Sequence, residues 1–225
     1  MIICNFAPLM KMNMLKFWMC CAMFCASLCF VSCTKNDENT LVLIGEENYI
    51  DDILSVIPDT LKVEFMDRFG TIPEGVVPPR VEGEYVVAPR VRVASNYAGW
   101  PVNIPEPNAY IRFADQHNGV VGLDLNEATE TFTDTVFVMG HDAMFTVYFI
   151  EDKNYDVTMQ EHDYHISLSR GVVMKGEITD EGIKNFRYAT IILDMQADGE
   201  GFELYSPGTY FIYKDGSNMA ERFDW

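Results

Sequence analysis

The chain has 225 residues, 16 of them basic and 34 acidic, which gives a formal net charge of −18 at pH 7. A polyanion repels nucleic acid and anionic lipid head groups, so both are excluded as partners held by nonspecific electrostatics. All six cysteines lie within residues 4–33, which also excludes a disulfide framework distributed through the fold.

Residues 1–32 have the layout of a secretory signal peptide. Lys11 and Lys16 precede an almost uncharged run over residues 17–31, and small residues come just before a possible cleavage point. The apolar run is shorter than the roughly 20 residues that a membrane-spanning helix needs. We therefore expect residues 1–32 to be a cleaved leader, with an uncleaved anchor as the alternative.

The stretch Phe30-Val31-Ser32-Cys33 resembles a bacterial lipobox, with a small serine before the cysteine and Phe30 in place of the usual leucine. The resemblance implies that Cys33 is the diacylated first residue of the mature chain. A zinc site needs paired ligands in polar surroundings, which this apolar stretch does not offer. Cleavage would reduce the basic residues from 16 to 14 against 34 acidic ones, for a formal charge of −20.

Residues 33–48 are expected to be the lipidated cysteine and a flexible tether, since residues 34–40 include no apolar side chain. The pair Asp37-Glu38 resembles the export signal that sends Bacteroidetes lipoproteins to the outer cell face, although a plain charged linker has the same composition. We expect an outer-membrane lipoprotein that faces the periplasm or the cell surface and contacts the membrane through the lipid on Cys33.

Two short amphipathic helices are predicted at the start of the domain that spans residues 49–225. Apolar residues at i, i+3, i+4 and i+7 from Ile50 give a helix with one apolar face, which Pro58 ends. Asp59 is placed to cap a second helix, and Gly70 to end it. The polar face is acidic rather than basic, so the apolar stripe is expected to pack on a sheet and not on a membrane.

After a connector rich in proline and glycine, the hydrophobic period becomes two. Val91 and Val93 alternate with Arg90 and Arg92 in a strand that we expect to bend at Pro89. Turn dipeptides occur at 118–119, 198–199 and 215–216. Eight or nine short strands at regular spacing predict a mostly β domain, an antiparallel β-barrel with a β-sandwich as the alternative.

Two segments carry a resemblance to a known family. PPRVEGEY at 78–85 and GEITDEGIKN at 176–185 resemble motifs of uncharacterised Bacteroidales lipoproteins. That resemblance implies a lipocalin-like or calycin-like barrel and favours the barrel over the sandwich. It brings no catalytic motif and no cofactor, and a fold by itself does not confer a function.

The residues that could support catalysis or bind a metal are sparse. In the segment EHDYH, His162 and His165 point to opposite faces of a strand and cannot both ligate one ion without a bend. His141-Asp142 follows a glycine in a predicted turn, which favours a loop pair over a catalytic dyad. No serine lies in a nucleophile elbow. We therefore expect no metal site, no cofactor and no enzymatic activity.

Aromatic residues offer the strongest hint of function, because a small barrel can leave a cavity lined by rings. The candidates for ligand binding are Tyr97, Trp100, Tyr148, Tyr188 and Tyr210. An interior packed full by these rings is the alternative. We expect a lipid-anchored, non-catalytic module for a small apolar or glycan ligand, with an accessory surface lipoprotein in a protein complex as the alternative.

Overall fold

The computed structural model of the protein describes residues 49–128, 130–159, 162–198 and 205–223. The predicted leader, Cys33 and the predicted tether lie outside these residues. The described part contains two helices and eleven strands, so the prediction of a mostly β domain with short helices is confirmed.

The two helices are α2 (Tyr49–Ser55) and α3 (Asp59–Phe69), separated at Pro58 as predicted. Gly70 ends α3 with φ of 85°, and its N–H donates to the Met66 carbonyl. The predicted cap by Asp59 is wrong: Pro58 occupies the N-cap, and the Asp59 carboxylate pairs with Lys62 at 2.8 Å. Neither described helix has the length and hydropathy to cross a membrane.

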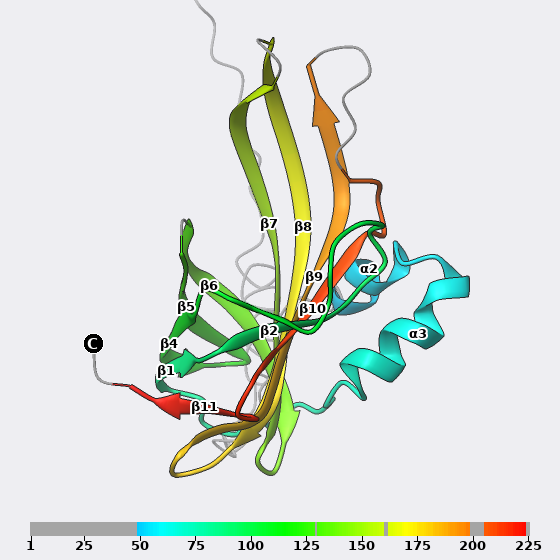
Figure 1. Cartoon of the computed structure of the whole chain (residues 1–225). Helices are drawn as coiled ribbons and strands as arrows, with labels where there is room; N and C mark the ends of the chain where they lie inside the picture. Colours follow the sequence, from blue (N-terminus) through cyan, green and yellow to red (C-terminus); the bar gives the residue numbers. More distant parts are fainter. Residues whose placement is uncertain (1–48, 129, 160–161, 199–204, 224–225) are drawn as a thin grey trace, which may run out of the picture. The chain divides into compact units, whose positions relative to one another are not determined.

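The strands form one antiparallel sheet, drawn in Figure 1. They are β1 (Gly83–Val87), β2 (Arg90–Ser95), β3 (Ile104–Glu106), β4 (Ala109–His117), β5 (Val120–Glu127), β6 (Glu130–His141), β7 (Met144–Met159), β8 (His162–Ile178), β9 (Gly182–Ala197), β10 (Tyr210–Asp215) and β11 (Met219–Arg222).

The pairing closes the sheet on itself. Neighbours run in the order β1, β4, β5, β6, β7, β8, β9, and β11 pairs with both β9 and β1. Strand β10 also pairs with β9, and β2 and then β3 follow β10 in the sheet. Along the chain, β2 follows β1, β3 precedes β4 and β10 precedes β11. This ring is the pairing pattern of a barrel-like fold, in which each ring strand has a paired neighbour on both sides.

Three strands are much longer than predicted: β7, β8 and β9 have 16, 17 and 16 residues and extend past their neighbours in Figure 1. Gly171 lies within β8. A Cβ there would sit 2.5 Å from the Cγ2 atom of Ile53 on α2. Glycine at this position leaves room for the helix and does not mark a turn.

The bend at Pro89 is confirmed, and it changes which side chains of β2 are buried. Tyr85 and Val87 are buried in β1, whereas in β2 the buried positions start at Arg90 and continue at Arg92. Two residues between the strands shift the alternation by one position. The alternation predicted for this strand is present, and Arg90 and Arg92, not Val91 and Val93, form its buried row.

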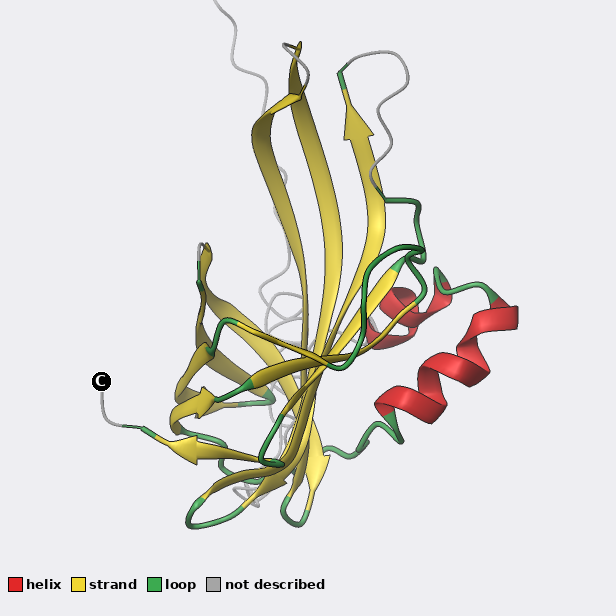
Figure 2. Cartoon of the chain, in the orientation of Figure 1, coloured by secondary structure: helices red, strands yellow, loops and turns green. Residues whose placement is uncertain are grey.

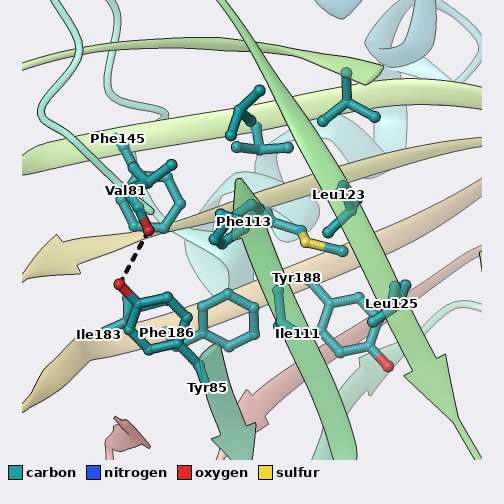
Figure 3. Close-up of a cluster of buried hydrophobic side chains, with 14 of the residues drawn as sticks. Val81, Tyr85, Ile111, Phe113, Leu123, Leu125, Phe145, Ile183, Phe186 and Tyr188 are labelled. Atoms are coloured by element: carbon teal, nitrogen blue, oxygen red, sulfur yellow. Dashed lines mark hydrogen bonds between the residues drawn. The ribbon is translucent and has the colours of Figure 1, made fainter. Parts of the chain in front are cut away.

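Much of the barrel interior is packed solid. Figure 3 shows the rings of Phe113, Phe145 and Phe186 filling the space between strands. Phe113 and Phe145 meet edge to face at 6.1 Å. The Tyr85 hydroxyl donates to the Val81 carbonyl at 3.0 Å, so the polar atom of this fully buried ring has a partner.

A second apolar cluster lies between the helices and the outer face of the sheet. Both helices lie on one side of the sheet in Figure 2. Ile53, Phe65 and Phe69 pack there against side chains of β8, β9 and β10. Phe65 meets Tyr210 edge to face at 5.2 Å, which confirms that the apolar stripe packs on a sheet.

Candidate functional site

A cavity of about 340 Å³ lies beside the turn that joins β5 to β6, above the packed part of the interior. Its size is at the lower end of the range for small-molecule pockets, roughly 300–1,000 Å³. The lining combines charged and aromatic side chains with the smaller Ala128, Leu168, Thr190 and Ile192. The charged ones are Arg90, Glu127, Glu130, Lys153 and Arg170, and the aromatic ones are Trp100, Tyr155, Tyr205, Phe211 and Tyr213.

Arg90 is the centre of one network of buried charges. Its side chain is 9% exposed, it pairs with Glu127 through Nη1, and its Nη2 lies 3.2 Å from Glu106. The same Nη1 donates to the Tyr188 hydroxyl at 2.6 Å, and that hydroxyl donates to Glu127. Arg92, 7% exposed, pairs with the other oxygen of Glu106.

The Tyr188 hydroxyl links Arg90 and Glu127 in this network. The Tyr188 ring is buried in the interior cluster and stacks on Tyr213 at a centroid distance of 4.7 Å. Burial raises the pKa of Tyr188 well above its usual value, and the charge of Glu127 adds to the effect. The hydroxyl therefore stays protonated and acts as a fixed donor to Glu127.

A second network lines the wall formed by β6, β7 and β8. Arg170 donates to Glu151 at 2.6 Å and lies 3.3 Å from Glu130, while Lys153 bonds Glu130 at 2.5 Å. Burial opposes the charge of Glu130, but the hydrogen bond and charge of Lys153, with the charge of Arg170, outweigh it and lower the pKa of Glu130. Glu130 is therefore a fixed anion near neutral pH.

In this wall, side chains hold β6 and β7 together where the backbone pairing between these two strands ends. Strand β6 pairs with β7 only from Phe137 opposite Tyr148 to His141 opposite Met144. Beyond that point Phe132 stacks on Phe149 at 4.3 Å, and Glu130 pairs with Lys153. We call this stretch the β6–β7 seam.

A group of contacting aromatic rings forms the rim of the cavity opposite the wall of β6, β7 and β8. Tyr97, Trp100, Tyr205 and Phe211 contact one another with centroid distances from 5.1 to 6.5 Å. The Arg92 guanidinium lies 4.3 Å from the centre of the Trp100 ring, whose residue is 40% exposed. The rim thus presents an indole held in place by a cation and partly open to solvent.

The two networks balance in charge. Four basic residues face four acidic ones, namely Arg90, Arg92, Lys153 and Arg170 against Glu106, Glu127, Glu130 and Glu151, and each has an opposite partner within 4.0 Å. The two networks together therefore have zero formal charge. Within the described residues, the buried Nε atoms of Arg90 and Arg92 have no hydrogen-bond acceptor.

The structure brings together only part of the predicted aromatic set. Trp100 lines the cavity, Tyr97 contacts the Trp100 ring, and Tyr188 accepts a hydrogen bond from the lining residue Arg90. Tyr148 and Tyr210 belong instead to the cluster covered by the helices, where Tyr148 stacks on Phe137 at 5.4 Å. These two rings lie on the outer face of the sheet, away from the cavity.

His117, His141 and His165 do not line the cavity, and the side chain of His162 lies outside the described part of the structure. His141 and Asp142 pair at 3.1 Å as an exposed turn pair, in agreement with the loop expected there. His165 bonds the exposed Asp156 at 2.9 Å. Among the described residues no cluster of three or more possible metal ligands occurs.

Comparison of the chain with protein-family models, with curated proteins and with solved structures gave no match in any of the three. Function must therefore be inferred from the geometry of the cavity and from the sequence features that precede the described domain.

Proposed function

We propose that the protein is a lipid-anchored lipoprotein of the cell envelope whose barrel-like domain binds a small ligand, without catalysis, in the cavity beside the β5–β6 turn. One observation carries the proposal: a cavity of about 340 Å³ lined by aromatic rings and ion-paired charges above an otherwise packed interior. A concave site with apolar surface and a few fixed polar groups is the usual form of a ligand pocket.

The ion pairs favour binding over hydrolysis. A glycosidase needs a general acid whose pKa is raised, and a second carboxylate that is free to act. Glu127 is instead paired with Arg90, and Glu130 has a lowered pKa beside Lys153 and Arg170. Fixed charges of this kind orient a ligand without exchanging protons with it.

The anchor is supported by the sequence alone. Ser32-Cys33 ends a positively charged and then apolar leader, and a tether without apolar residues follows. A diacylated Cys33 would hold the domain at a membrane through buried methylene groups, each contributing about 0.8 kcal/mol. We place the protein at the outer membrane, facing the periplasm or the cell surface.

Trp100 provides a direct test of binding. Of the three tryptophans, Trp18 lies in the leader that cleavage would remove, so Trp225→Phe leaves Trp100 as the sole indole emitter of the mature chain. A library of glycans and apolar compounds added to the mature chain in lipid nanodiscs is expected to include one that shifts this emission saturably. Absence of any such shift, together with unchanged thermal unfolding across the library, would contradict a binding function.

The anchor has its own test. Cells expressing the chain are labelled with radioactive palmitate, and the wild type is compared with Cys33→Ala and with the matched control Cys29→Ala. We expect label on the wild type and on the control but not on Cys33→Ala. Equal labelling of all three would refute lipidation at Cys33 and leave the ligand proposal standing.

A further inference from the structure

We infer that the ligand of this cavity is a neutral saccharide; this rests on the proposed function and names the class of its ligand. The alternatives that the cavity must distinguish are an apolar chain, a charged small molecule and a neutral polyhydroxy compound. Each places a different demand on the side chains around the cavity.

An acyl chain or other apolar ligand fits poorly. The interior beneath the cavity is already filled, since Tyr85, Phe113 and Phe186 are each at most 1% exposed. A chain confined to the cavity would meet Leu168 and Ile192 but would also lie against Arg90, Glu127 and their partners. It would displace water from these charged groups and offer no hydrogen bond in return, which is costly.

A charged ligand meets a different obstacle. Every charge of the two networks is already compensated, and several of the paired side chains are about nine-tenths buried, among them Arg90, Arg92 and Glu151. An added anion or cation would have to displace a member of an existing pair. Leaving one partner of a buried pair uncompensated is strongly unfavourable.

Neutral hydroxyls avoid both costs. A sugar hydroxyl can accept from an arginine and donate to a glutamate without altering the charge balance, and such charge-assisted hydrogen bonds are stronger than neutral ones. Arg90, Lys153 and Arg170 line the cavity together with Glu127 and Glu130, so donors and acceptors for such hydroxyls lie side by side.

The aromatic rim supplies the apolar half of saccharide recognition. A pyranose ring has a face of C–H groups, which packs on an aromatic ring. Trp100 is 40% exposed and its ring is fixed by the Arg92 guanidinium, while Phe211 and Tyr205 lie beside it. Fixed rings bind with little loss of conformational entropy.

The test uses the mature chain with Trp100 as the sole tryptophan, in lipid nanodiscs. It is titrated with neutral disaccharides (maltose, cellobiose, lactose and diacetylchitobiose), with glucuronic acid and with lauric acid, and heats of binding are measured in parallel. We expect saturable binding of at least one neutral disaccharide. The affinity obtained from these heats should fall about 3- to 10-fold in Trp100→Ala. The exposed aromatic Phe223 lies outside this cavity, so Phe223→Ala should bind as the wild type does.

Charge selection is tested with Glu130→Gln, which leaves the cavity with one excess positive charge. This variant should gain affinity for glucuronic acid by about tenfold over the wild type. Binding of lauric or glucuronic acid by the wild type, in preference to every disaccharide and lost in Trp100→Ala, would overturn the saccharide assignment and keep the binding function. If none of the probes binds and the wider library is also silent, both fail.

Discussion

Arg90 is the residue whose replacement tests the buried network most directly. Arg90→Met keeps a long side chain but removes the partner of Glu127, the donor to the Tyr188 hydroxyl and one of the cations near Glu106. Because the Glu127 side chain is only 16% exposed, water cannot fully replace the lost arginine.

The expected loss in the free energy of unfolding depends on the partners that Glu127 and Glu106 retain. Removing one partner of a buried ion pair costs about 3–5 kcal/mol. Glu127 retains the Tyr188 hydroxyl and Glu106 retains Arg92, so we expect a value near the lower bound, about 3 kcal/mol. Proteins of this size have free energies of unfolding of about 5–15 kcal/mol, so the variant should fold but unfold at a clearly lower urea concentration.

The assay is urea unfolding followed by circular dichroism at pH 7, on the wild type, Arg90→Met, Glu127→Gln and the double variant. Once Glu127 is neutral, loss of Arg90 should cost less, with a coupling of about 1–3 kcal/mol between the two sites. Additive effects, or an Arg90→Met variant as stable as the wild type, would refute the claim that this pair is buried and coupled.

Further predictions concern the sheet and its helices. Burial, with the charge of Arg187 in support, lowers the pKa of Lys175 to about 8, so between about pH 8 and 10.5 the folded state binds fewer protons than the unfolded state. Its contribution to the free energy of unfolding therefore rises with pH across this window. Urea titrations at pH 7.5 and 9.5 should show a rise in the wild type that is smaller in Lys175→Met, and an equal rise in both would contradict it. Gly171→Ala should destabilise the protein by about 1–3 kcal/mol, because the new Cβ would meet Ile53 at 2.5 Å. Thermal unfolding should show this loss partly relieved in an Ile53→Ala background, and no coupling would mean that α2 does not pack closely on β8.

Local signals in the sequence predicted the helices and several turns. Pro58 and Gly70 act through their own backbone restrictions, so the helix ends could be read without knowing the rest of the fold. The turn at Asn118-Gly119 has φ values of 48° and 74°, which these two residue types adopt readily. Such effects depend on a few adjacent residues and are therefore visible in one sequence.

The bend at Pro89 shows where local reasoning fails. The proline itself was a clear signal, but the number of residues consumed by the bend decides which later side chains face inward. A strict alternation from Tyr85 places Val91 inside, whereas the structure buries Arg90 and Arg92. Two arginines at alternate positions next to a strand bend were the available signal of a polar interior.

The charge networks could not be found from sequence at all. Arg90 contacts Glu127 across 37 positions and Tyr188 across 98, and Tyr188 contacts Glu127 across 61. In a chain with 34 acidic residues, nothing local distinguishes the few that are buried from those on the surface. Only closure of the sheet brings β2, β5 and β9 together.

Stability alone does not account for this network. Replacing a buried ion pair by well-packed apolar residues is often neutral or stabilising, so an apolar filling at this level would hold the barrel at least as well. The chain uses apolar filling where Phe113, Phe145 and Phe186 meet. Five of the eight network charges instead line the cavity. The costly polar groups and the cavity coincide, and that coincidence is the physical reason to place the function at this end of the barrel.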